Sequence, residues 1–209
     1  MSFYRAALMI IAATALTACS GGAGLVTRNL PADSPLLGAG AGEALAPVPL
    51  NPSYNVVGVN VEVPESLTSS EENGYKPRVD ILWQEDPAGD RHSQVDKLMT
   101  AALDEGVAGL TGERDVVLDV VMTRFHALTK RTRYSIGGEH EVWMYLTVRD
   151  AETGAVVEPA RLIGFDERIS PEQAMANEAK GMNQRIEINE LVKAMIRHEL
   201  TRPRDFLQG

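Results

Sequence analysis

The stretch RDVVLDVVMTRFHALT, residues Arg114–Thr129, decides the fold. Apolar side chains stand at every second position along it, which is the period of a β-strand, and valines fill several of the intervening positions. A return strand is predicted over Glu139–Arg149, where every second residue is again apolar. The turn residues Asp150–Gly154 then lead into a third strand near Ala155–Phe165. We expect these consecutive strands to form an antiparallel meander, with a wide hairpin end formed by Lys130–Gly138.

Two strands and a helix are predicted before the meander. Valines alternate with other residues up to Pro64, which ends the first strand: Val57, Val59, Val61 and Val63. A short second strand is expected at Val79–Trp83, before the turn residues Asp86–Gly89. Apolar residues at helical spacing then indicate an amphipathic helix from Arg91 to about Gly109.

The last predicted element is helical. Ser170 is placed to cap a helix, with Pro171 in the first turn and Gln173 at the capping-box position. Apolar residues continue to Ile196, so the segment forms one long helix or two helices broken near Gly181. The predicted order is β-β-α-β-β-β-α. This order indicates an α+β fold in which the helices pack on one face of a mainly antiparallel sheet.

The first residues have the order of an export signal. Arg5 precedes the uncharged stretch Ala6–Leu16, and small residues follow it. A membrane-spanning helix is the weaker interpretation, because polar residues and glycines interrupt the apolar run before it reaches about 20 residues. We therefore expect a signal peptide over residues 1–18.

The residues Leu16-Thr17-Ala18-Cys19 resemble the bacterial lipobox. The resemblance implies cleavage after Ala18, diacylglycerol on the thiol of Cys19 and a further acyl chain on the new amino terminus. Several acyl chains on one residue anchor a protein far more stably than one chain does. Ser20, rather than aspartate, follows the cysteine, which implies sorting to the outer membrane.

The mature chain is predicted to have two parts. Residues 19–52 carry the lipidated cysteine and are rich in Gly, Ala and Pro, which is typical of a tether with a reach on the order of 30 Å. Residues 53–209 are expected to form one periplasmic domain. The chain has a net charge of −9, which makes nucleic acid a poor candidate partner.

No residue set in the sequence specifies a reaction. Cys19 is the only cysteine, and the histidines lack the short spacing of metal hydrolases, so we predict no metal, cofactor or catalytic residue. His140 stands on the opposite face of its strand from Glu139 and Glu141, and we expect it at a solvent-facing strand edge. An alternative hypothesis, a hydrolase, would use three residues of one loop: Asp86, Asp90 and His92.

One basic run stands out on this acidic chain. Lys130, Arg131 and Arg133 form a possible interaction patch for anionic lipid headgroups or an acidic partner surface. The alternative is a solvated hairpin whose charges discourage edge-to-edge pairing. Three aromatic side chains could line a ligand groove, although aromatic residues on strands more often pack in the core: Trp83, Trp143 and Tyr145.

Two family resemblances rest on quoted segments. The lipobox, the tether, Val61–Leu67 and Ile81–Pro87 together are similar to the auxiliary lipoproteins of ABC-type transport systems that move lipids across the envelope. Over most of the mature chain the sequence also resembles a family of uncharacterised alphaproteobacterial lipoproteins with a domain of unknown function. The resemblances imply a small α/β domain that docks on other envelope components, and they bring no activity with them.

The sequence therefore predicts a non-enzymatic accessory or scaffold lipoprotein, which could serve an envelope transport assembly. Its expected location is the inner leaflet of the outer membrane, facing the periplasm, with an envelope protein as its partner. The alternative is a protein that binds lipid or a small hydrophobic molecule in a groove between its sheet and its helices.

Overall fold

The computed structural model of this chain describes residues 54–202, so the predicted signal peptide, Cys19 and the predicted tether lie outside the described residues. The strands are β1 (Tyr54–Glu62), β2 (Ile81–Leu82), β3 (Arg114–His126), β4 (Gly138–Asp150) and β5 (Val156–Ile169). The helices are α1 (Arg91–Val107), α2 (Lys130–Arg133), α3 (Pro171–Glu178) and α4 (Gln184–Thr201).

The sheet has the strand order β1-β3-β4-β5, and β2 pairs with the far end of β3. The predicted antiparallel meander is confirmed, because β4 pairs antiparallel with both β3 and β5. The first two strands run parallel to β3 instead. Helix α1 lies between them and β3 in the chain, and a helical crossover is the usual way to return the chain for a parallel pairing.

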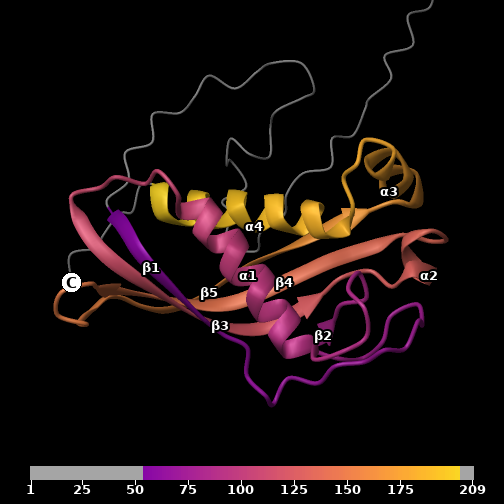
Figure 1. Ribbon diagram of the computed structural model, residues 1–209, viewed down its shortest axis with the longest axis horizontal. Coiled ribbons are helices and arrows are strands. Elements are labelled where there is room, and N and C mark those ends of the chain that lie inside the picture. Colours follow the sequence, from indigo (N-terminus) through magenta and orange to yellow (C-terminus); the bar gives the residue numbers. More distant parts are fainter. Residues whose placement is uncertain (1–53, 203–209) are drawn as a thin grey trace, which may run out of the picture.

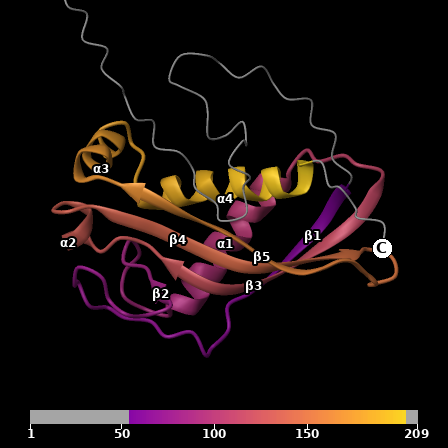
Figure 2. The ribbon, with the colours of Figure 1, turned by 180° about the vertical axis from the view of Figure 1, so that it is seen from behind.

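Helices α1 and α4 cover one face of the sheet (Figures 1 and 2). Alternate side chains of β3 point to that face and are fully buried: Val116, Leu118, Val120 and Met122. The opposing helix side chains Met99 and Ile196 are also fully buried. The α+β prediction with helices on one face of a mainly antiparallel sheet is therefore confirmed.

Local structure differs from the prediction at the turn before β4. The residues predicted as a wide hairpin end form the short helix α2, because Thr129 caps it by accepting a hydrogen bond from the backbone N–H of Thr132. After the sheet, the capping box of Ser170 and Gln173 is confirmed. Of the two arrangements predicted for the following segment, the chain forms two helices, and Gly181 between them has a φ of 79°.

The two large helices meet at Gly106. A Cβ atom on this residue would lie 2.5 Å from Cγ2 of Ile196 and 3.0 Å from Cα of Lys193. The side chain of Arg197 also donates a hydrogen bond from Nε to the carbonyl oxygen of Gly106, at 3.1 Å. Only a residue without a side chain allows α4 to approach α1 this closely.

We predict that Gly106→Ala lowers the free energy of unfolding by about 1–3 kcal/mol, because the added methyl group overpacks the helix contact. In an ordinary helix the same change would stabilise the protein by up to about 1 kcal/mol. Urea unfolding measures the difference. Gly58→Ala is the control, because its Cβ would make an ordinary 3.7 Å contact with Val117. A Gly106→Ala variant as stable as the parent would contradict the close approach.

Candidate functional site

Residues Asn73–Asp80, which we call the strap, cross the end of the sheet beside α2. The strap is held through its backbone carbonyl oxygens. Thr129 Oγ1 donates to the oxygen of Gly74 at 2.7 Å, His126 Nε2 lies 3.1 Å from that of Pro77, and Phe125 donates its backbone N–H to that of Asp80 at 2.9 Å. Its backbone is thus fixed while the side chains of Tyr75, Lys76 and Arg78 are exposed, which is typical of a binding loop on a rigid scaffold.

On one side of the strap lies a surface formed by Tyr75, Lys130, Arg131, Tyr134 and Ile136, which we call the α2-end surface. Its apolar side chains are strongly exposed, at 48% for Tyr75, 50% for Tyr134 and 62% for Ile136. The guanidinium carbon of Arg131 lies 4.1 Å from the ring centroid of Tyr75. Lys130 and Arg131 are exposed, and neither forms an ion pair within residues 54–202.

Arg133, which was predicted to belong to the same patch, is buried, with only 2% of its side chain exposed. Its Nη1 and Nη2 atoms donate to the two carboxylate oxygens of Glu187, at 2.9 and 3.0 Å, and its Nε donates to Glu178 at 2.9 Å. The basic run forms a turn of helix, so its side chains point in different directions instead of sharing one surface. The patch predicted from the sequence therefore keeps Lys130 and Arg131 and loses Arg133.

His140 on β4 lies beside the ion pair of Arg133 and Glu187. This histidine is fully buried, which corrects the expectation of a solvent-facing strand edge, and its Nε2 lies 3.4 Å from Oε2 of Glu187. Burial lowers the pKa of His140, so the ring is neutral near pH 7. Burial alone would raise the pKa of the Glu187 carboxyl, but hydrogen bonds from His140, Arg133 and Asn177 outweigh it and hold that pKa at about 2. The cluster joins α2, α3, β4 and α4.

The three residues of the hydrolase hypothesis have separate structural partners. Asp86 accepts a hydrogen bond from Nε1 of Trp83 at 2.8 Å and pairs with Arg185. Asp90 caps α1, and His92 Nε2 lies 2.9 Å from the carbonyl oxygen of Leu67. Within the described part of the chain, no group of three His, Cys, Asp or Glu side chains is arranged to hold a metal ion.

The aromatic residues considered for a ligand groove do not share one. Trp83 is fully buried and packs edge-on against Phe125, with ring centroids 5.7 Å apart. Trp143 donates from Nε1 to Asp166 at 2.7 Å, and Tyr145 is 46% exposed. These two side chains belong to alternate positions of β4 that do not face the core with Val142 and Met144.

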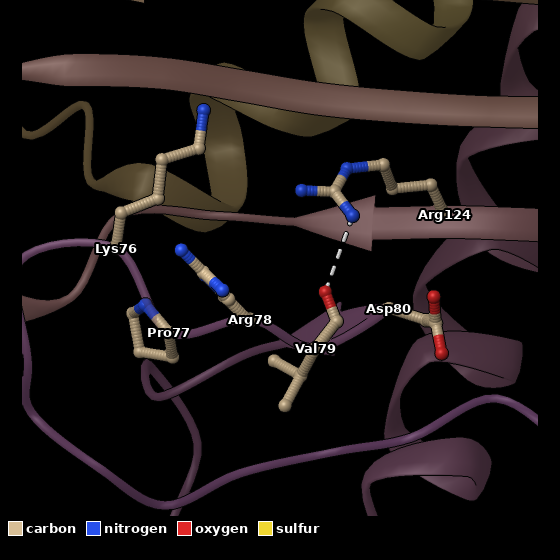
Figure 3. A pocket seen from close by; sticks show the side chains of 6 residues that line it. All are labelled: Lys76, Pro77, Arg78, Val79, Asp80 and Arg124. Carbon is tan, nitrogen blue, oxygen red and sulfur yellow. Dashed lines mark hydrogen bonds between the residues drawn. The ribbon is translucent and has the colours of Figure 1, made fainter.

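On the other side of the strap is a hollow that the sequence did not predict. It has a volume of about 540 Å³, and we call it the arginine hollow because the guanidinium groups of Arg78 and Arg124 face it together with Lys76 (Figure 3). Lys76 Nζ lies 2.8 Å from Glu141, which also pairs with Arg124. Arg124 is far from Lys76 and Arg78 in the sequence, so no local motif indicates the hollow.

A family described as a family of unknown function, DUF6778, matches residues 54–208. The chain belongs to this family. Membership of a family of unknown function was expected from the sequence. The family description assigns no activity to its members. No curated protein matches the chain.

Several solved structures are similar to parts of this DUF6778 member. A Xanthomonas campestris protein of family DUF330 has 12% identity and a TM-score of 0.40, over 73% of this chain and 88% of its own. PelC from Paraburkholderia phytofirmans, solved as a dodecamer, has 15% identity and a TM-score of 0.33, over 73% and 89%. A candidate lipoprotein from Caulobacter crescentus has 18% identity and a TM-score of 0.22, over 50% and 82%.

We predict that Arg133→Met lowers the free energy of unfolding by about 3–5 kcal/mol, because it leaves the buried carboxylate of Glu187 without its main partner. Arg131→Met, at an exposed neighbouring position, should change stability by no more than about 0.5 kcal/mol. Chemical unfolding at pH 7 measures both variants. Equal losses for the two would show that Arg133 is not the buried partner.

The pH dependence of stability should reflect Glu187. Its pKa is about 2 in the folded protein and near 4.5 when exposed, so its contribution is present above the unfolded pKa and is lost as pH falls from 4.5 toward 2. We expect Glu187→Gln to be less stable than the parent at pH 7 and to lose less stability between pH 5 and pH 2. Unfolding curves across that range test this, and parallel curves for the two proteins would contradict it.

Proposed function

We propose that this chain is a lipid-anchored, non-enzymatic accessory protein of the bacterial envelope that docks on an acidic protein partner through the α2-end surface. The observation that carries the proposal is the composition of that surface. It joins two cations that have no carboxylate partner within residues 54–202 to three exposed apolar or aromatic side chains, on a chain whose net charge is −9. We propose more specifically that the partner belongs to an envelope transport assembly. This part of the proposal rests on the sequence resemblance to transport auxiliary lipoproteins.

The chemistry of the surface favours a protein partner. Tyrosine and arginine are enriched in the buried centres of protein interfaces, where a planar ring and a guanidinium fill a pocket at little entropic cost. Arg131 stacked on Tyr75 is such a pair, and Ile136 adds apolar area beside it. Because no ion pair within the described residues neutralises Lys130 or Arg131, a partner with Asp and Glu at the matching positions would associate faster and more specifically.

The position of the surface supports the same choice. Tyr54, where the described chain begins, pairs with Arg114 at the start of β3, whereas α2 follows the other end of β3 (Figure 1). β3 has 13 residues. At about 3.3 Å per residue it separates the two ends by roughly 40 Å. If lipid on Cys19 holds the chain, the α2-end surface lies at the end of the domain away from the attachment, where it is open to a protein partner.

The non-enzymatic role is supported by the roles of the candidate catalytic residues, each of which stabilises a loop or a helix end. The alternative of a lipid-binding groove between sheet and helices has less support, because buried side chains fill this layer, including Trp83, Met99, Leu118 and Met144. No helix within residues 54–202 is long and apolar enough to cross a membrane. Placement in the outer membrane, facing the periplasm, rests on Cys19 followed by Ser20.

The test is crosslinking in intact cells, followed by mass spectrometry of the captured proteins. We expect the native chain to capture one envelope protein through acidic residues, and Lys130→Glu with Arg131→Glu to reduce that capture by roughly tenfold or more. Cys19→Ala should reduce capture as well and should abolish labelling with palmitate.

The matched control is Lys97→Glu, which reverses an exposed lysine on α1, on the helical layer of the domain. This variant should capture the same protein as the parent. Equal capture by the double charge reversal and by Lys97→Glu would remove the α2-end surface as the docking site. Capture that does not depend on Cys19 would remove the lipid anchor from the proposal.

A further inference from the structure

The arginine hollow lies beside the strap and is separate from the α2-end surface. It is lined by Lys76, Pro77, Arg78, Val79, Asp80 and Arg124. Figure 3 shows the guanidinium groups of Arg78 and Arg124 directed toward the space between them, whereas Lys76 extends alongside and its Nζ pairs with Glu141. Two of these cations come from the strap and one comes from the end of β3, so two separately fixed backbones present them.

Arg124 is held in a defined orientation. Its Nη1 donates to the carbonyl oxygen of Val79 at 3.2 Å, and its Nε donates to Glu141. Its Nη2 has no hydrogen-bond partner within residues 54–202, and it remains available on the side of the hollow. A guanidinium fixed through two of its nitrogens can offer the third without losing further side-chain entropy.

Arg78 is the cation of the hollow whose charge is least compensated. Its side chain forms no hydrogen bond or ion pair within the described part of the chain, although it lies close to two other cations. The carboxylate of Asp80 does not neutralise it, because this group accepts hydrogen bonds from the backbone N–H and Oγ1 of Thr68, at 2.8 and 2.7 Å. In Figure 3 the Asp80 carboxylate points away from Arg78.

We propose that the arginine hollow binds a phosphate group. The guanidinium groups of Arg78 and Arg124 approach from different directions, with the Glu141-paired ammonium group of Lys76 beside them, and this arrangement matches the distributed oxygens of a phosphate better than the flat edge of one carboxylate. Glu141 already pairs with Lys76 and Arg124, so the bound group would chiefly supply the counter-charge that Arg78 lacks within residues 54–202. The phosphate can belong to a soluble molecule or to a lipid headgroup, since the recognising chemistry is the same. This inference does not depend on the docking proposal.

The experiment is isothermal titration of the purified full chain carrying Cys19→Ala with inorganic phosphate, at constant ionic strength. We expect saturable binding that Arg78→Gln weakens at least about tenfold, since it removes a charge-assisted contact. Arg78 is exposed and forms no hydrogen bond or ion pair with the rest of the described domain, so this variant should fold. Arg168→Gln is the matched control. Its side chain is 78% exposed on β5 and does not line the hollow, so phosphate affinity should not change.

A second arm identifies the source of the phosphate. Sedimentation with vesicles of phosphatidylglycerol in phosphatidylcholine compares the same background with and without Arg78→Gln. If Arg78→Gln reduces vesicle binding, and free phosphate competes with the vesicles to the same extent, the bound phosphate belongs to a lipid headgroup. If phosphate binds but Arg78→Gln does not change vesicle binding, the bound phosphate belongs to a soluble molecule.

Absence of saturable phosphate binding to the folded chain would overturn the proposal, as would binding that Arg78→Gln leaves unchanged. If phosphate does not bind but Arg78→Gln reduces capture of the protein partner, the hollow holds a carboxylate of that partner and the phosphate proposal is wrong. If the double variant Lys130→Glu with Arg131→Glu loses partner capture but still binds phosphate, the two sites are both supported and act separately.

Discussion

The guanidinium of Arg133 can be buried only because both carboxylate oxygens of Glu187 accept hydrogen bonds from it. This contact fixes α2 against α4, and through Glu178 it also fixes α3. Once α2 is in place, its capping residue Thr129 and the helical residue Thr132 donate from their hydroxyl groups to carbonyl oxygens of the strap. The α2-end surface and the arginine hollow lie on either side of that strap, so both depend on one ion pair in the interior.

The sequence predicts those elements whose signal is local. Alternating apolar residues in β3 and β4 and the capping box at Ser170 are each contained in a few neighbouring residues, and the meander and the helix start are confirmed. The parallel pairing of β1 with β3 is not local, because it depends on how α1 returns the chain. The four-residue helix α2 was missed because glycines and a basic run are equally typical of a hairpin end.

The residues of the candidate site also differ in whether their role could be predicted from local sequence. Composition alone identifies Lys130 and Arg131 as exposed cations, but the same composition places Arg133 beside them, and only the packing of Glu187 distinguishes it. The arginine hollow could not be predicted, because Arg78 and Arg124 meet through tertiary structure. Membership of DUF6778 defines the relatives of this chain without assigning an activity, so the case for docking rests on the surface itself.

The strap has a consequence for how such domains diversify. Its attachments to β3 and α2 run mainly through main-chain oxygens, which every amino acid possesses. The side chains at Tyr75 and Arg78 can therefore be exchanged without disturbing the frame that presents them. A lineage that keeps the acceptors of the strap and the threonines below it is free to alter what the loop recognises, so two members of the family with superimposable backbones can differ entirely in the molecules they select.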